Sequence, residues 1–140
     1  MLAKPGSGLE FQKDQILRSD IRSGDTVIWG LTHELRRPTW TDEGVTTTDI
    51  SIETFEETGI YLSVTSIFQV INFCRKIGAR LILMPIICSE SIKLGLAHVP
   101  EFLSLPYQSD FIDLGSDDLH PGPQQHRAWA DCVMESKLLK

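Results

Sequence analysis

The stretch from Ser116 to Pro123, Ser-Asp-Asp-Leu-His-Pro-Gly-Pro, holds the side chains whose types and spacing best suit catalysis. Asp117 lies three residues before His120, and two prolines follow the histidine. An imidazole acts as a general base when one ring nitrogen faces the nucleophile and a carboxylate holds the other, which fixes the tautomer and stabilises the imidazolium. The spacing therefore predicts a base, His120, that is oriented by Asp117.

The same stretch also suits the start of a helix. Asp117 or Asp118 would then accept backbone N–H bonds, with Pro121 or Pro123 near the first helical turn. On the motif alone, both interpretations stay open.

Alternating helical and strand patterns predict the elements that must position these residues. Such alternation is typical of an α/β domain with a mostly parallel sheet. Strands are expected over residues 25–31, 80–87 and 111–114, with a short extended piece at 1–4. Helices are expected over residues 9–21, 53–77 and 123–138, with a short helix and irregular chain in 89–107. A turn at residues 5–8 and a long polar loop at 32–51, overhanging the site, complete the prediction.

Apolar stripes at helical spacing predict which side chains face the core. Gly78 is expected to end the second helix, Gly59 to interrupt it, and Pro85 to mark the end of a strand or an irregularity in it. The residues expected inside are Ile16, Leu17, Ile21, Trp29, Ile67, Val70, Ile71, Cys74, Ile77, Ala128, Trp129, Cys132 and Val133.

Length and charge exclude several classes of protein. A chain of 140 residues makes a single domain that buries roughly two thirds of its unfolded surface. A net charge of −6 argues against a nucleic-acid partner, because phosphate neutralisation needs clustered Lys and Arg. Three widely spaced cysteines have no zinc or redox spacing, which predicts reduced thiols, no metal and no cofactor.

The sequence also predicts a cytoplasmic protein with no membrane partner. Its start has no apolar run of signal-peptide length, and the longest apolar stretch, residues 81–88, is too short to span a bilayer.

Three loops are expected to meet beyond the carboxyl ends of the strands, where open parallel sheets bind ligands. These are residues 32–37, 88–91 and 116–120.

Three motifs and their order along the chain resemble those of the SGNH, or GDSL-type, hydrolase superfamily. The likeness lies in a Pro-Gly-Ser-Gly turn at 5–8, a strand ending in Trp-Gly-Leu-Thr at 29–32, and Asp-x-x-His-Pro-Gly at 117–122 before a helix. The resemblance implies a flavodoxin-like three-layer α/β/α domain that hydrolyses acyl or acetyl esters of small molecules, glycans or lipids.

Carried over by position, the resemblance makes His120 the general base and Asp117 its orienting carboxylate. Gly6 or Gly8 would supply a backbone N–H to the oxyanion, and Thr32 would stand where the family has an asparagine donor. The neighbouring His33 either touches a ligand or is an exposed loop residue.

The sequence departs from the family at the nucleophile. No Gly-Asp-Ser turn precedes residue 5, so we expect an N-terminally shortened member that lacks the family's serine. Residues 1–4 would then pair directly with the strand at 25–31, or leave a sheet edge that a homo-oligomer covers.

Four residues are candidate substitutes for the nucleophile: Ser7, Cys88, Ser89 and Ser116. Ser7 is the best of them, because it lies before a helix whose N–H groups favour an oxyanion. Small residues in turns and a buried thiol at a strand end are the alternative explanation of all four.

Other polar and aromatic side chains are ambiguous. Trp40 lines a pocket or covers a sheet edge, Arg36 and Arg37 bind an anionic group or face solvent, and His98 and His126 are expected on the surface.

Three functions remain open from the sequence. They are an ester hydrolase, a non-catalytic binding module on the same scaffold, and a structural domain in which the Asp117–His120 turn only caps a helix.

Overall fold

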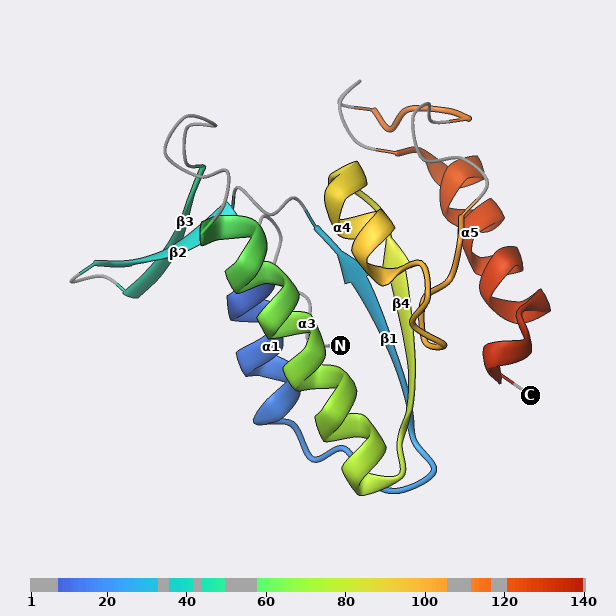
Figure 1. The fold of residues 1–140 in the computed structure, drawn as a ribbon. Coiled ribbons are helices and arrows are strands. Elements are labelled where there is room, and N and C mark those ends of the chain that lie inside the picture. The colour runs from blue at the N-terminus through green and yellow to red at the C-terminus, as the bar shows by residue number, and fades with distance from the viewer. Residues whose placement is uncertain are drawn as a thin grey trace.

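The computed structural model describes residues 8–32, 36–41, 44–49, 58–105, 112–116 and 121–139, with the backbone alone for 36–41, 44–49 and 58. These residues form a mixed α/β structure in which helices pack against a parallel pair of strands (Figure 1). The α/β class predicted from the sequence is therefore confirmed, whereas the flavodoxin-like three-layer arrangement stays a prediction.

The centre of the structure is the strand pair β1 (Thr26–Leu31) and β4 (Arg80–Pro85). The two strands run parallel, with Thr26 opposite Arg80 and Leu31 opposite Pro85. Both are rich in branched aliphatic residues, which favour the extended backbone. The strand ends at Pro85, one of the two outcomes that the sequence predicted.

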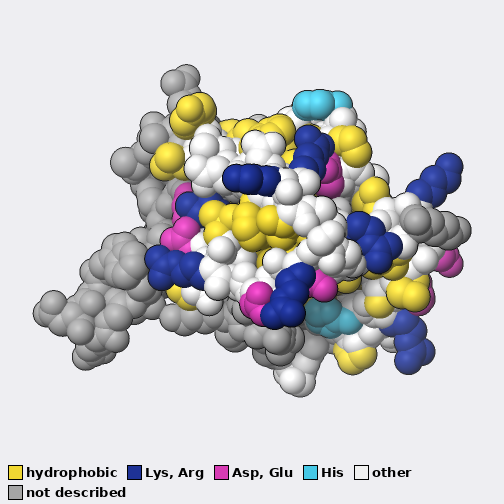
Figure 2. Space-filling model, turned by 90° about the horizontal axis from the view of Figure 1, so that it is seen from below, with side chains coloured by type: hydrophobic (Ala, Val, Ile, Leu, Met, Phe, Trp, Pro, Cys, Tyr) yellow, Lys and Arg dark blue, Asp and Glu magenta, His cyan; other side chains and the backbone are white. Residues whose placement is uncertain are grey.

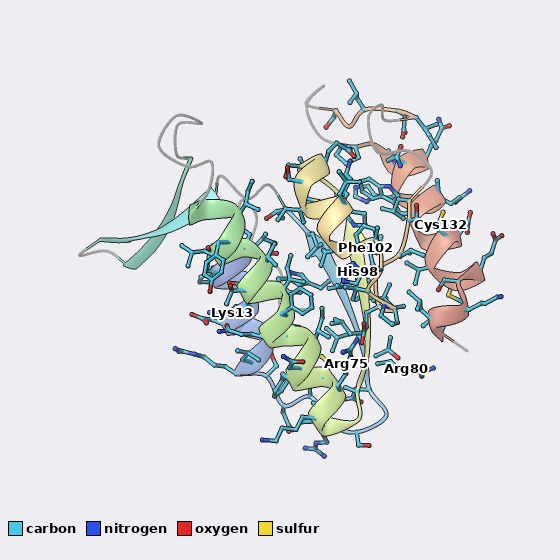
Figure 3. All side chains as sticks on the ribbon, viewed as in Figure 1. Lys13, Arg75, Arg80, His98, Phe102 and Cys132 are labelled. Carbon is cyan, nitrogen blue, oxygen red and sulfur yellow. The ribbon has the colours of Figure 1, made fainter. Side chains whose placement is uncertain are left out.

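A short segment pairs with the other edge of β4. Phe102 forms a parallel bridge with Leu83, and the Leu83 N–H donates to the Glu101 carbonyl at 2.8 Å. The Glu101 carboxylate also receives two hydrogen bonds from the Arg75 guanidinium, at 2.6 and 2.8 Å, and this bonding raises the pKa of Arg75. Arg75 and Phe102 are labelled in Figure 3.

Helices pack on both faces of the strands (Figure 1). Helices α1 (Leu9–Leu17), α3 (Thr58–Ile77) and α4 (Glu90–Leu96) share one apolar cluster with β1 and β4. Helix α5 (Pro123–Glu135) packs on the opposite face of β4 and leads into the 3₁₀ helix η1 (Lys137–Leu139).

Strand β4 supplies side chains to both clusters because successive residues of a strand point to opposite faces. Leu81 and Leu83 face the α1, α3 and α4 side, whereas Ile82 and Met84 face α5. Of the predicted inward residues, Ile16, Trp29, Ile67, Val70, Ile71, Cys74, Trp129 and Val133 are buried, and Leu17, Ile21, Ile77, Ala128 and Cys132 are half-buried.

Two glycines close the end of the sheet where the strands begin. Gly78 follows the last residue of α3 with φ +74°, as the expected helix stop requires, and Gly24 has φ +88°. The Gly24 N–H donates to the Gly78 carbonyl at 2.9 Å, which joins the two connections. Left-handed backbone of this kind favours glycine.

The prediction of a polar loop over residues 32–51 was wrong. The chain instead forms an antiparallel hairpin, β2 (Arg36–Thr41) and β3 (Gly44–Asp49), with Thr41 opposite Gly44. Threonine is the commonest residue of this stretch, and its β-branched side chain favours strands even when the stretch is polar.

Three further boundaries differ from the prediction. Helix α1 ends at Leu17, so Ile21 packs on the core from outside the helix, and Gly59 lies within α3 rather than interrupting it. In the described part of the expected strand at 111–114, residues 112–114 form no strand, and Leu114 makes only an isolated antiparallel bridge to Pro121.

Charged side chains of both signs are mixed on the face seen from below, around a patch of hydrophobic side chains (Figure 2). Within the described ranges, no helix has both the length and the apolar character needed to cross a membrane.

Candidate functional site

The carboxyl ends of β1 and β4 lie at one end of the fold, at the top of Figure 1, where α4 and α5 begin. Helix α1 contacts β1, since the Trp29 indole N–H donates to Gln12 Oε1 at 2.8 Å. The described part of this rim therefore gathers the ends of two strands and the starts of α4 and α5.

Two of the predicted oxyanion residues are described. Gly8 is the buried N-cap of α1, with an extended backbone at φ −77° and ψ 168°. Thr32 directly follows β1 and is half-buried. The remaining predicted site residues, Gly6, Ser7, His33, Asp117 and His120, lie outside the described residues.

The substitute nucleophiles that are described occupy different environments. Ser89 is the N-cap of α4, and its Oγ accepts a hydrogen bond from the Ile92 N–H at 3.4 Å. Cys88 is 8% exposed at the end of the connection from β4, and Ser116 is exposed. The helix cap gives Ser89 a structural role that is independent of catalysis.

The N-terminus of α5 is capped by Asp113, a residue that the sequence analysis did not select. Its Oδ1 accepts from the Gln125 N–H at 2.8 Å and its Oδ2 from the Gln124 N–H at 3.1 Å. Its backbone carbonyl accepts from the Gly122 N–H at 2.9 Å. Asp113 therefore accepts from the backbone N–H groups of Gly122, Gln124 and Gln125 at the start of this helix.

This arrangement leaves no first-turn donor of α5 unbonded. Pro123 has no N–H, Gln124 and Gln125 donate to Asp113, and His126 donates to the Gly122 carbonyl at 3.1 Å. Asp113 thus binds donors that one interpretation gave to Asp117 or Asp118, and these two residues lie outside the described residues. Pro123 does occupy the first helical turn, as one interpretation predicted.

The residues just before and just after the stretch 117–120 contact each other and α5. Leu114 bridges Pro121, which closes the connection formed by residues 115–120. The buried Gln125 side chain accepts from the Ile112 N–H at 2.8 Å, which ties the entering chain to α5 as well.

Gly122 permits this anchoring because nothing larger fits at its position. A Cβ at Gly122 would lie within 2.7 Å of the Leu114 carbonyl oxygen and would overlap the Asp113 carboxylate. The glycine of the Asp-x-x-His-Pro-Gly motif is therefore explained by close packing against the preceding chain.

Local capping rules could not have identified Asp113. A helix cap is usually sought at the residue just before the helix, whereas Asp113 lies ten positions before Pro123 in the sequence. The one signal in the sequence was a carboxylate within the apolar stretch 111–114, which predicted a strand.

The histidines that the structure describes are His98 and His126. His98 is exposed beyond the end of α4, as Figure 3 shows, and His126 is exposed on α5, so both match the expected surface positions. The His126 ring stands edge-on to Trp129 with 5.4 Å between ring centroids. Within the ranges that the structure describes, no three His, Cys, Asp or Glu residues are grouped as metal ligands would be.

A hollow of about 630 Å³ runs along β1 rather than across the rim. Its walls are residues 25–30 of the strand, Gln12 and Ile16 of α1, and the flanking Ile21 and Ile86. Because it follows the side of the strand that does not face β4, it is a feature of the sheet edge.

Searches with this chain found no matching family model, no matching curated protein and no matching solved structure. The resemblance to SGNH hydrolases therefore depends on the motifs of the sequence.

Proposed function

We propose that the chain is an SGNH-type ester hydrolase domain with a flavodoxin-like α/β/α arrangement, acting on acyl or acetyl esters of small molecules, glycans or lipids. The observation that carries the proposal is that the first-turn N–H groups of α5 already have acceptors in Asp113 and Gly122. Since these donors do not require Asp117 or Asp118, the Asp-x-x-His spacing favours general-base chemistry over capping of α5.

In the proposed reaction, His120 takes the proton of a hydroxyl nucleophile as it bonds to the ester carbonyl carbon. The imidazolium, held by Asp117, then gives this proton to the leaving alkoxide as the carbon–oxygen bond of the ester breaks. Water, activated by the same imidazole, hydrolyses the acyl intermediate. Backbone N–H groups near Gly8 and the hydroxyl of Thr32 would stabilise the oxyanion.

Two features of the described residues support this assignment of roles. Helix α1, which Gly8 caps, contacts β1 through the bond from Trp29 to Gln12, and Thr32 directly follows β1. Leu114 and Pro121, which flank the stretch with Asp117 and His120, bridge each other directly before α5, and α5 starts at the end of the fold where β1 and β4 end.

The test is hydrolysis of an activated acyl ester, together with labelling by a serine-directed fluorophosphonate. We expect turnover, with a loss on the order of 10²–10⁴-fold in His120→Gln because a general base is removed. His98→Gln, which changes an exposed histidine, is the matched control and should keep full activity. Peptide mapping of the labelled protein, repeated with Ser7→Ala, identifies the nucleophile.

Absence of both turnover and labelling would overturn the hydrolase proposal. A glycan-binding screen would then separate the binding module from the structural domain. Equal activity in His120→Gln and His98→Gln would show that the imidazole of the motif is not the base.

A further inference from the structure

The side chain of Gln125 is fully buried in the first turn of α5, whereas its neighbours Gln124 and His126 are exposed. Gln125 Oε1 accepts from the Ile112 N–H at 2.8 Å, and the Gln125 backbone N–H donates to Asp113 Oδ1 at 2.8 Å. One residue of the helix therefore bonds two consecutive residues of the chain that precedes the Asp-x-x-His motif.

The other end of the Gln125 amide makes this burial costly. The Nε2 group is inaccessible to solvent and has no hydrogen-bond partner among the residues that the structure describes. A buried donor without a partner destabilises a fold, and an apolar side chain of the same size would avoid that cost. An apolar side chain could not, however, accept from the Ile112 N–H. The bond to Ile112 is therefore what a glutamine supplies at this position.

This bond acts together with contacts that join the two ends of the connection 115–120. Leu114 bridges Pro121, and the Asp113 carbonyl accepts from the Gly122 N–H at 2.9 Å. A connection whose ends are held has fewer available conformations than a free chain. Catalytic side chains within such a connection need less ordering before they react.

We propose that Gln125 is a positioning residue of the esterase site, which holds the Asp-x-x-His stretch in the geometry needed for catalysis. The inference rests on the proposed function, in which Asp117 orients His120 as the general base. Gln125 acts through Ile112 rather than by contact with the substrate. Loss of its side-chain bond should therefore slow the chemical step and leave substrate binding nearly unchanged.

Gln125→Met tests this role, because methionine fills a similar volume and its thioether is only a weak acceptor. We expect kcat for an activated acyl ester to fall about 10²-fold with KM nearly unchanged, as for a misplaced catalytic group. Gln124→Met is the matched control, since it makes the same replacement at the adjacent exposed position and should keep the wild-type kcat. Each variant is assayed well below its own unfolding midpoint, so that loss of folded protein does not lower the rate.

The division of the effect between kcat and KM separates positioning from the other roles of a buried glutamine. A residue that only stabilises the fold would leave kcat of the folded variant unchanged, and a residue that binds substrate would raise KM. If Gln125→Met does not fold, Gln125→Asn gives the same comparison, because its amide is one methylene shorter and cannot keep the same bond to Ile112.

Equal kcat in Gln125→Met and Gln124→Met would overturn the positioning role and leave the proposed function in place. A raised KM with unchanged kcat would overturn it as well. Absence of turnover in the wild-type protein would instead overturn the proposed function, and the role of Gln125 with it.

Discussion

At the scale of single residues, the thiol of Cys74 gives the clearest link between packing and titration. It is 1% exposed on the inner face of α3. Burial raises the pKa of this thiol because it disfavours the thiolate, and the negative charge of Glu101 adds to the effect. The folded protein therefore holds Cys74 in its neutral form to a higher pH than the unfolded chain does.

This shift predicts a loss of stability at alkaline pH. Its contribution is fully present below the pKa of the unfolded thiol, about 8.5, and is lost as the pH rises through the raised pKa of the folded state. Urea unfolding of wild type and Cys74→Val between pH 7 and 10 should show their difference in unfolding free energy moving steadily in favour of the variant. Ile71→Val, a buried change without a titrating group, should keep a constant difference from wild type. A constant difference for Cys74→Val would contradict the prediction.

Individual buried residues could be predicted well from the sequence, whereas single polar contacts could not. Ile67, Val70 and Cys74 repeat at helical spacing, and periodicity alone gives the face that they share. The bond between Trp29 and Gln12 joins residues seventeen positions apart, and no local pattern marks it. The difference arises because burial depends on the period of one element, but a hydrogen bond depends on how two elements meet.

At the scale of elements, α5 depends on an acceptor that lies outside it. We expect Asp113→Ala to lower the free energy of unfolding by about 1–2 kcal/mol, since two first-turn N–H groups lose their partner. Asp131→Ala removes the same charge from an exposed position of α5 and should change the stability little. Urea denaturation followed by circular dichroism gives both values, and equal stability of the two variants would show that the cap contributes nothing.

The elements themselves were predicted where apolar periodicity is strong, as in β1, β4, α3 and α5. The hairpin of β2 and β3 was missed because its strands are polar, so no alternation of apolar and polar residues marks them. The strand expected at 111–114 was predicted from its apolar residues. In the structure the Ile112 N–H and the Asp113 carboxylate bond to Gln125 of α5 instead.

At the scale of the whole molecule, β4 joins two apolar clusters that otherwise lie on opposite faces of the sheet. Its alternate residues belong to different clusters, so neither cluster can lose its packing without disturbing the strand. We infer that the two faces unfold together.

This inference predicts a single unfolding transition that core variants on either face shift as a whole. Ile71→Ala, on the α3 side, should cost about 2–5 kcal/mol, and Val133→Ala, on the α5 side, should also lower the midpoint. Met134→Ala, whose side chain is 69% exposed, is the control and should move it little. Far-ultraviolet and near-ultraviolet circular dichroism should give coincident curves, and two separate transitions in Val133→Ala would refute the coupling.

The bond between Gly24 and Gly78 also determines where this chain can be lengthened. A Cβ at Gly78 would approach the Ser23 hydroxyl oxygen to 2.9 Å, and the two connections share a backbone hydrogen bond. Residues inserted into either connection would therefore separate partners that hold each other. Grafted peptides and new loops therefore belong away from these two connections.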